Sequence, residues 1–505
     1  MRYNSTRDSG ISLSAEEVIV KGISDDGGLF VPENIPTLTA DEMDKLPRMD
    51  YIQCGSVVLS KFLTGFTADE IQSCLQKAYT KEKFGGNPAP LTELNKSAFM
   101  LELWHGPTCA FKDMALQLLP HLLSVSMKKT GGDRVLILVA TSGDTGKAAL
   151  EGFRDADGTE IVVFYPQNGV SDMQKLQMIT QEGSNVKVYG IDGNFDDAQT
   201  AVKNIFADKN ITKILKETGR SFSSANSINW GRLVPQIIYY VQAYVSLVGS
   251  GKIKQGERIN YVVPTGNFGN ILSAYYAKKM GIPVNKLICA SNSNNILTDF
   301  ISHGVYDRNR RFITTLSPSM DIIISSNLER LLYDICGRDS DFIRTLFAGL
   351  AADGRYEISD SLRTRLQSEF YGGYCDDAAT KKQIAKTFGE YGYTLDTHTA
   401  VATAVYEEYA AKTGDSTKTV IASTASIYKF PHSVLESLGG NPDGDPFTVM
   451  QRLKDICGVE IPPQLLQLKN AVPRFNQTIS PENMGDVVAS PPSCLSLWER
   501  CHAGA

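Results

Sequence analysis

The segment Glu102-Leu-Trp-His-Gly-Pro-Thr-Cys-Ala-Phe-Lys-Asp113 joins an apolar run to a helical pattern. Residues 98–103 predict a short buried strand, which Gly106-Pro107 ends. Residues 108–127 carry apolar side chains at helical spacing and predict a helix. Lys112 therefore lies where the helix dipole and apolar neighbours disfavour a charged amine, and a lysine of depressed pKa can form a Schiff base. The local pattern alone fits an ordinary solvated lysine better.

Size and charge exclude several classes of protein. A chain of 505 residues exceeds one compact core, which predicts two or three domains. Its 42% hydrophobic and 21% charged residues are typical of a soluble globular protein. The formal net charge of -6 gives no reason to expect nucleic acid or an anionic membrane as a partner.

Targeting and metal signals are also missing from the sequence. The first residues have no apolar signal core, and no uncharged apolar run reaches membrane-spanning length. The nine cysteines form no Cys-x-x-Cys pair, which favours reduced thiols and a cytoplasmic location. The six histidines show no His-x-x-x-His spacing, so we expect no metal site.

Four sections of the chain differ in pattern. Residues 1–92 are predicted to be a mostly helical segment, and 93–250 a smaller α/β domain that carries Lys112. Residues 251–475 are predicted to be a larger α/β domain with a helical insertion at about 327–393. Residues 476–505 are a weakly patterned tail. The strand–loop–helix units of both domains predict parallel sheets covered by helices.

Two glycine-rich turns each join a predicted buried strand to a helix. They are Thr141-Ser-Gly-Asp-Thr-Gly146 and Thr265-Gly-Asn-Phe-Gly-Asn270. Free amides at a helix N-terminus can bind an anion, although the first stretch fits a plain strand-to-helix turn equally well. The second is neither a Gly-x-Gly-x-x-Gly loop nor a nucleotide P-loop, so it suits a phosphate monoester.

Other polar groups flank predicted strands and helices. Asn226, Asn229 and Arg232 precede a long apolar helix, where they could bind an anion or simply cap the helix. Thr424 follows the predicted strand 418–423, at the edge where open α/β sheets bind ligands. Lys429 adds a further cation.

Seven motifs in order resemble the threonine synthases, pyridoxal-phosphate enzymes of the tryptophan synthase β superfamily, in their longer yeast and enteric-type branch. The motifs are Tyr3-Asn-Ser-Thr-Arg, Asp26-Gly-Gly-Leu-Phe-Val-Pro, His105-Gly-Pro-Thr-Cys-Ala-Phe-Lys-Asp, Thr141-Ser-Gly-Asp-Thr-Gly, Asn226-Ser-Ile-Asn-Trp, Pro264-Thr-Gly-Asn-Phe-Gly and Ser423-Thr-Ala. The resemblance implies two doubly wound parallel-sheet domains of the fold-type II pyridoxal-phosphate enzymes. It also implies conversion of O-phospho-L-homoserine and water to L-threonine and phosphate.

The resemblance also assigns roles to residues. Lys112 would hold pyridoxal 5'-phosphate through a Schiff base, and Thr424 would meet the pyridine nitrogen. The cofactor phosphate would lie among Gly266, Asn267, Phe268, Gly269 and Asn270. The residues expected at the substrate are Thr141, Ser142, Asp144, Thr145, Asn226, Asn229, Arg232 and Lys429. We expect a monomer or homodimer.

Two departures from the family pattern leave alternatives open. Asn270 stands where the family often has Asp, and Thr424-Ala-Ser-Ile-Tyr-Lys-Phe430 stands where it often reads Thr-Ala-His-Pro-Ala-Lys-Phe. A related dehydratase or phospho-lyase is one alternative, and a non-enzymatic binding module is another. A nucleotide-binding protein is a third, although no acidic ribose partner follows a Gly-x-Gly-x-x-Gly loop.

Overall fold

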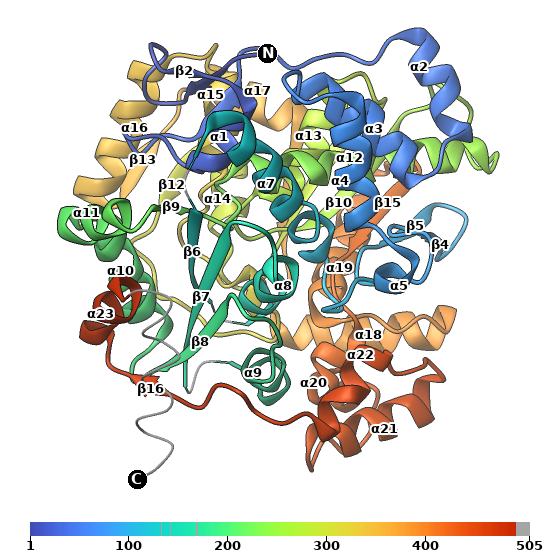
Figure 1. Cartoon of the computed structure of the whole chain (residues 1–505). Helices are drawn as coiled ribbons and strands as arrows, with labels where there is room; N and C mark the ends of the chain where they lie inside the picture. Colours follow the sequence, from blue (N-terminus) through green and yellow to red (C-terminus); the bar gives the residue numbers. More distant parts are fainter. Residues whose placement is uncertain (133, 142, 168–169, 491–505) are drawn as a thin grey trace.

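Two mostly parallel sheets form the centre of the computed structural model, which describes residues 1–132, 134–141, 143–167 and 170–490 (Figure 1). The larger sheet has the strand order β14-β11-β10-β15-β5-β4. Only its edge strand β4 runs antiparallel to its neighbour. The strands are β4 (Leu91–Glu93), β5 (Ala98–Glu102), β10 (Ile259–Pro264), β11 (Val284–Ser291), β14 (Phe370–Tyr374) and β15 (Thr419–Ser423).

The smaller sheet is parallel throughout, in the order β16-β8-β7-β6-β9. Its strands are β6 (Arg134–Ala140), β7 (Thr159–Pro166), β8 (Val186–Ile191), β9 (Arg220–Ser223) and β16 (Thr478–Ile479). Near-continuous apolar runs such as 135–139 are buried, as expected for strands covered on both faces. The predicted fold class, two parallel sheets covered by helices, is confirmed.

Helices cover both sheets. Around the smaller sheet they are α7 (Leu119–Thr130), α8 (Asp144–Phe153), α9 (Asp172–Ile179), α10 (Phe195–Ala207), α11 (Lys209–Glu217) and α23 (Met484–Ala489). Around the larger sheet they are α12 (Trp230–Gly249), α13 (Gly269–Lys279), α14 (Ile296–His303), α15 (Leu328–Ile335), α16 (Ser340–Asp353), α17 (Asp360–Glu369), α18 (Asp377–Tyr391) and α19 (Thr397–Thr413). Helix α12 is buried almost all round and packs against α13, so it lies inside the molecule.

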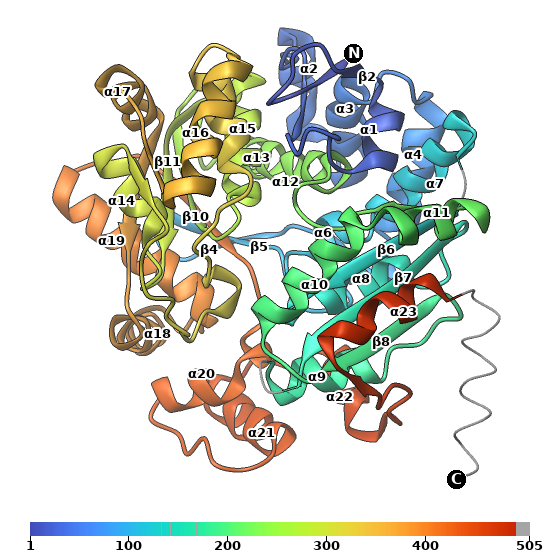
Figure 2. The same cartoon turned by 90° about the vertical axis from the view of Figure 1, so that its left-hand side faces the viewer.

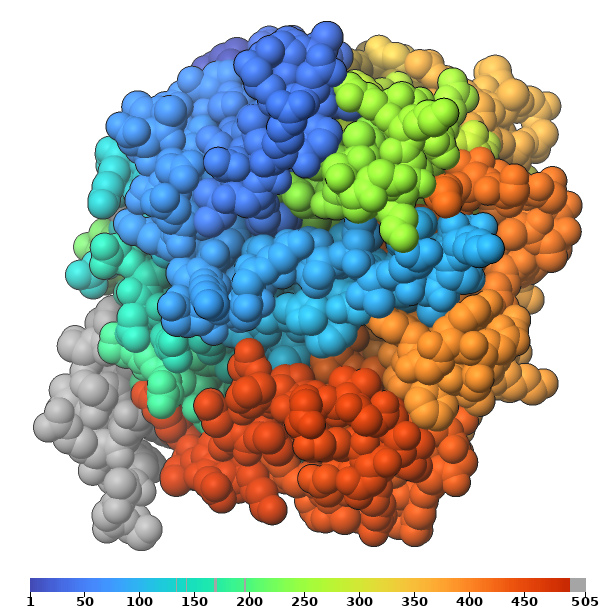
Figure 3. Space-filling view, turned by 90° about the vertical axis from the view of Figure 1, so that its right-hand side faces the viewer, coloured from blue at the N-terminus to red at the C-terminus, as the bar shows by residue number. Residues whose placement is uncertain are grey.

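The N-terminal segment is mostly helical, as predicted. Its helices are α1 (Ala15–Lys21), α2 (Ala40–Lys45), α3 (Tyr51–Phe62), α4 (Ala68–Ala78) and α5 (Lys81–Phe84). Capping boxes begin the first four, for example Ser14 with Glu17. A small antiparallel sheet joins them, made of β1 (Tyr3–Ser5), β2 (Ser12–Leu13) and β3 (Phe30–Pro32). Figure 3 shows this blue segment and the red C-terminal helices at opposite ends of one face.

Three predicted domain boundaries are wrong. Strand β5, just before Lys112, pairs with β15 in the larger sheet, so residues 93–250 are not one domain. Strand β14 is an edge strand of the larger sheet beside β11, so residues 327–393 are not purely a helical insertion. Its sequence Phe370-Tyr-Gly-Gly-Tyr374 lacks the apolar run that marks a buried strand.

The third correction concerns the tail. Strand β16 extends the smaller sheet beside β8, and α23 packs against α10 and α11 (Figure 2). Residues 476–490 therefore belong to the smaller sheet's layer although they are far from it in sequence. The chain reaches them through α20 (Pro431–Ser437), α21 (Pro446–Cys457) and α22 (Pro463–Leu466). Two-residue strands carry too little pattern to be found in a sequence.

The helix predicted over 108–127 is also divided. A four-residue helix α6 (Asp113–Leu116) follows Lys112, and α7 begins at Leu119. Pro120 occupies the first turn of α7, where its missing N–H costs nothing. In the described ranges, no helix is long and apolar enough to cross a membrane.

Candidate active site

Lys112 lies in a turn that hydrogen bonds between Asp113 and Thr108 hold in place. The Asp113 carboxylate accepts hydrogen bonds from the Thr108 backbone N (2.8 Å) and hydroxyl (2.7 Å). Gly106 is needed here, because a Cβ on it would lie 2.5 Å from an Asp113 oxygen. The next link is Phe111, whose N–H donates to the Thr424 carbonyl at 2.8 Å. Lys112 is therefore held beside the carboxyl end of β15.

The Lys112 amine lies among charged groups. Loss of hydration by burial lowers its pKa to about 8, against the opposing charge of Asp144. The cations Arg232 and Lys429 lower that pKa further. The expected depression of the pKa is thus present, and burial rather than the helix dipole is its first cause. The amine Nζ donates a hydrogen bond to Ser319 Oγ at 3.1 Å.

The glycine-rich turn 265–270 lies against the same serine. A Cβ on Gly266 would be 2.7 Å from the Ser319 carbonyl oxygen, so only glycine allows this approach. Phe268, the cap residue just before α13, has φ 63°, a left-handed conformation that is strained for a phenylalanine and typical of ligand-binding turns. The amine of Lys112 and the bend at Gly266 thus share Ser319 as a direct neighbour.

Asn270 fits a phosphate at this turn. Its amide oxygen accepts hydrogen bonds from the hydroxyls of Tyr239 and Tyr240. Its buried Nδ2 has no hydrogen-bond partner among the described residues. Leaving such a donor unpaired is costly, and a phosphate oxygen would satisfy it. The turn therefore has the spare donor that a phosphate monoester needs.

In turn 141–146, more of the backbone N–H groups already bond a side chain of the same turn than in turn 265–270. Thr141 Oγ1 accepts from the N–H groups of Gly143 (3.0 Å) and Gly146 (2.9 Å). Asp144 Oδ1 pairs with the buried Lys429 Nζ at 3.0 Å. Burial alone would raise the pKa of Asp144, but Lys429 and Lys112 hold it well below its usual range. Of the other predicted residues, Thr145 is half-buried on α8, and Ser142 lies outside the described residues.

The residues at the N-terminal end of α12 have different roles from one another. Asn229 is fully buried and caps α12: its oxygen accepts from Gly231 N, and its amide donates to the Ile19 and Ser224 carbonyls. Because its polar atoms are committed in this way, Asn229 matches the helix-cap alternative. Asn226 is exposed. Arg232 donates to the Ala225 carbonyl at 2.6 Å, while its buried Nε lacks a partner among the described residues.

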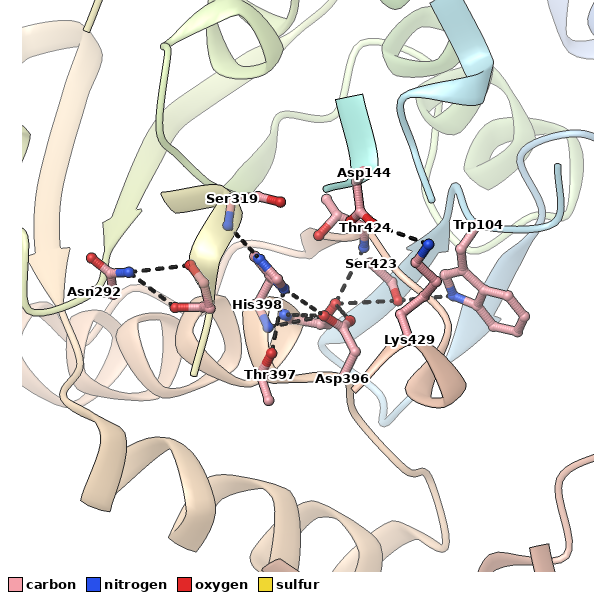
Figure 4. Close-up of polar contacts among 12 residues, drawn as sticks. Trp104, Asp144, Asn292, Ser319, Asp396, Thr397, His398, Ser423, Thr424 and Lys429 are labelled. Atoms are coloured by element: carbon pink, nitrogen blue, oxygen red, sulfur yellow. Dashed lines mark hydrogen bonds and ion pairs between the residues drawn. The ribbon is translucent and has the colours of Figure 1, made fainter. Parts of the chain in front are cut away.

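The sequence did not point to Ser319, which contacts Lys112, or to His398 and Asp396, which lie behind Ser319. Ser319 N donates to His398 Nε2 at 3.1 Å, and His398 Nδ1 lies 3.2 Å from Asp396 Oδ1. Figure 4 shows His398 next to Ser319, and Asp396 on the side of Thr424. Asp396 caps α19, and because an aspartate at this position is typical of any helix start, the sequence alone gives no sign of its link to Ser319.

In the part of the chain that the structure describes, no group of three or more His, Cys, Asp or Glu side chains could hold a metal ion.

Three family models match most of the chain. "Threonine synthase N terminus" matches residues 2–79, "Pyridoxal-phosphate dependent enzyme" matches 83–425, and "Threonine synthase, C-terminal" matches 399–477. A solved structure of pyridoxal-phosphate-bound threonine synthase from Brucella melitensis superposes with a TM-score of 0.86 and 35% identity. That match covers 97% of this chain and 99% of the other.

Curated relatives carry two kinds of name. The threonine synthase of Pseudomonas aeruginosa is 40% identical over 435 residues, covering 86% of this chain and 90% of that protein. The Homo sapiens protein named threonine synthase-like 1 is 41% identical over 432 residues, covering 84% of this chain. The chain spans only 58% of the length of that human relative.

Proposed function

The chain belongs to the threonine synthase family of pyridoxal-phosphate-dependent enzymes, and we propose that it converts O-phospho-L-homoserine and water to L-threonine and phosphate. The observation that carries the proposal is the placement of one amine. Lys112 Nζ donates a hydrogen bond to Ser319 Oγ, and the Ser319 backbone lies against the bend at Gly266. An amine that can form a Schiff base and a turn that can bind a phosphate are therefore neighbours.

Pyridoxal 5'-phosphate is the cofactor, and the residues present suit it. Lys112 would bind its aldehyde, while Gly266, Asn267, Phe268, Gly269 and Asn270 would surround its phosphate. The spare Asn270 amide donor supports this assignment. Thr424 lies beside the Lys112 turn and would offer its hydroxyl to the pyridine nitrogen. When bound, the cofactor supplies an electron sink for a carbanion on the substrate.

The substrate's phosphate would need a second group of donors. Two buried cations, Arg232 and Lys429, lie near the Lys112 amine, and Lys429 is paired with Asp144. The buried carboxyl of Asp113 also acts on both cations. Thr141 uses the N–H groups of Gly143 and Gly146, so the remaining first-turn donors of α8 are those of Asp144 and Thr145. We propose that these groups bind the phosphate that leaves.

Lys112 would also move the protons. An amine whose pKa is near 8 is partly unprotonated at neutral pH, so it can accept a proton from the substrate Cα. The same ammonium can then return a proton to carbon. Phosphate departs from Cγ, and water adds at Cβ, which balances the overall reaction.

One assay tests this function. Purified protein with added cofactor is incubated with O-phospho-L-homoserine, and phosphate and amino acids are measured together. Equal amounts of phosphate and threonine are expected. Phosphate without threonine or any oxo acid, or no turnover at all, would contradict the proposal. The Lys112→Ala variant serves as the control for background hydrolysis.

A related phospho-lyase is the second candidate. It is favoured by the departure at Ser426-Ile-Tyr428, directly after the proposed pyridine partner, and by relatives that are named only threonine synthase-like. The same assay separates the two functions, because a lyase would give 2-oxobutyrate with the phosphate. An unchanged substrate together with a cofactor absorbance band would instead indicate a binding module.

Two finer features belong to the proposal. A cytoplasmic location is supported by the seven described cysteines, which are all free thiols. A monomer or homodimer is expected, and sedimentation of the purified protein would test it. A larger oligomer would contradict that expectation.

A further inference from the structure

The Lys112 amine is held by a chain of hydrogen bonds that begins in a different helix. Asp396 Oδ1 lies 3.2 Å from His398 Nδ1, His398 Nε2 accepts the Ser319 N–H at 3.1 Å, and Ser319 Oγ accepts from Lys112 Nζ at 3.1 Å. Asp396 and His398 are buried, with 1% and 3% of their surfaces exposed. Groups buried to this extent are ordered by their partners rather than by water.

The contacts determine which histidine nitrogen carries the proton. Because Nε2 accepts a backbone N–H, it cannot carry a hydrogen of its own. The proton is therefore on Nδ1, where it donates to the Asp396 carboxylate. A neutral imidazole held in one tautomer gives the Ser319 N–H a fixed hydrogen-bond acceptor. Phe430 packs against the His398 ring, with 4.9 Å between the ring centroids.

The other side of the Ser319 segment is fixed as well. Asn292, at the carboxyl end of β11, donates to Thr315 Oγ1 at 2.8 Å and to Ser317 Oγ at 3.1 Å. Asp321 accepts from Thr315 Oγ1 at 2.7 Å. The short turn that carries Ser319 is thus anchored by β11 on one side and by α19 on the other (Figure 4).

Asp396 links this arm to the proposed pyridine partner. Its second oxygen accepts the Thr399 hydroxyl, and Thr399 Oγ1 in turn accepts the N–H of Thr424 at 3.2 Å. A single buried carboxylate therefore orders groups on two sides of the Lys112 turn.

We propose that Ser319 is a catalytic residue that holds the Lys112 amine through its hydroxyl, and that His398, fixed by Asp396, is the positioning residue for Ser319. The proposal rests on the proposed function, since it concerns the proton steps of that reaction. When Lys112 takes the Cα proton, the new ammonium still donates one N–H to Ser319 Oγ. The proton stays on Nζ until it returns to carbon, so Ser319 directs the amine without gaining or losing a proton.

The first experiment removes the hydroxyl. Ser319→Ala is expected to lower kcat by about 10- to 100-fold, as for loss of a hydrogen bond to a charged group, with KM changed by less than about threefold. A second readout uses apoprotein: borohydride trapping after cofactor addition should show capture at Lys112 slowed by about 10-fold. Ser319→Thr keeps a hydroxyl and should recover most of both rates. The matched control is Ser302→Ala, an exposed serine on α14.

The second experiment tests the positioning role. His398→Leu removes the acceptor of the Ser319 N–H and should slow capture and kcat as Ser319→Ala does. His398→Gln offers an amide oxygen to the same N–H and should recover at least part of the loss. His303→Leu, at an exposed histidine on α14, is the control, and thermal unfolding of each variant reports its fold.

The outcomes separate this inference from the proposed function. Wild-type protein that neither captures the cofactor nor makes threonine would overturn the function itself. Active wild type together with an equally active Ser319→Ala variant would overturn only the role of Ser319. If Ser319→Ala is slow but His398→Leu and His398→Gln are equally impaired, the positioning role of His398 is wrong.

Discussion

The two glycine-rich turns look alike in sequence, but they differ in how many of their hydrogen-bonding groups already have partners within the protein. In turn 141–146, the Thr141 hydroxyl takes two backbone N–H groups, and Asp144 is paired with Lys429. In turn 265–270, the Asn270 amide has a donor without a partner among the described residues, and Phe268 is strained. Unsatisfied donors and strain mark a turn built for a ligand, whereas internal partners mark one that also serves the fold.

The comparison depends first on the amine that lies near both turns. Lys112→Ala should lower turnover by about 1,000-fold or more and abolish covalent capture of the cofactor, because proton transfer and attachment are both lost. Phosphate release and borohydride trapping would measure this. Far-ultraviolet circular dichroism should be unchanged, and near-normal activity would make the assignment of Lys112 wrong.

A methyl group at Gly266 tests the close approach of the second turn. Gly266→Ala puts a Cβ 2.7 Å from the Ser319 carbonyl and should weaken cofactor binding by about 10- to 100-fold, since overpacking costs a few kcal/mol. Gly389→Ala on α18 is the control, because a Cβ there meets nothing within 4 Å. Fluorescence titration of apoprotein gives both affinities, and equal losses would contradict this close approach.

The first turn is tested through its carboxylate. Asp144→Asn leaves the buried Lys429 without its anionic partner, so we expect a lower unfolding temperature. Because Asp144 raises the pKa of Lys112, removing it should lower that pKa further. Capture of the cofactor needs the unprotonated amine, so its rate should rise with pH around 8 in wild type and at lower pH in the variant. An unmoved midpoint would show that Asp144 does not act on Lys112.

The smallest effect is expected at Asn270. Asn270→Asp keeps an acceptor for Tyr239 and Tyr240 but adds a negative charge beside the proposed phosphate. We expect cofactor affinity to fall by only about three- to tenfold, because surrounding donors screen the charge. The same fluorescence titration measures it. A gain in affinity would place the phosphate elsewhere.

Much of the fold follows from local patterns. Buried strands such as β6 and β10 are near-continuous apolar runs, and capping boxes mark α1 and α4. Strand β14 could not be predicted from the sequence, because two of its five residues are glycine and its place at a sheet edge is decided by pairing with β11. Edge strands are stabilised by a neighbour more than by their own sequence, so a single sequence shows them poorly.

The candidate site divides in the same way. Lys112, the two turns and Thr424 each follow a strand or begin a helix, and that local context made them visible. Ser319 has no such context, because it lies in a short turn whose position depends on Asn292 and His398. Asn229 is the opposite case: its local context predicted a substrate contact or a helix cap, and in the structure its side chain caps α12.

By itself, the sequence determined that parallel strands end in two glycine-rich turns and that one lysine begins a helix after a sharp turn, because these features need only short-range periodicity, glycine and proline. The tertiary structure alone decided which sheet the lysine belongs to, which turn keeps a spare donor, and which serine meets the amine. Those properties depend on burial and on hydrogen bonds between residues hundreds of positions apart, as with Lys112 and Ser319.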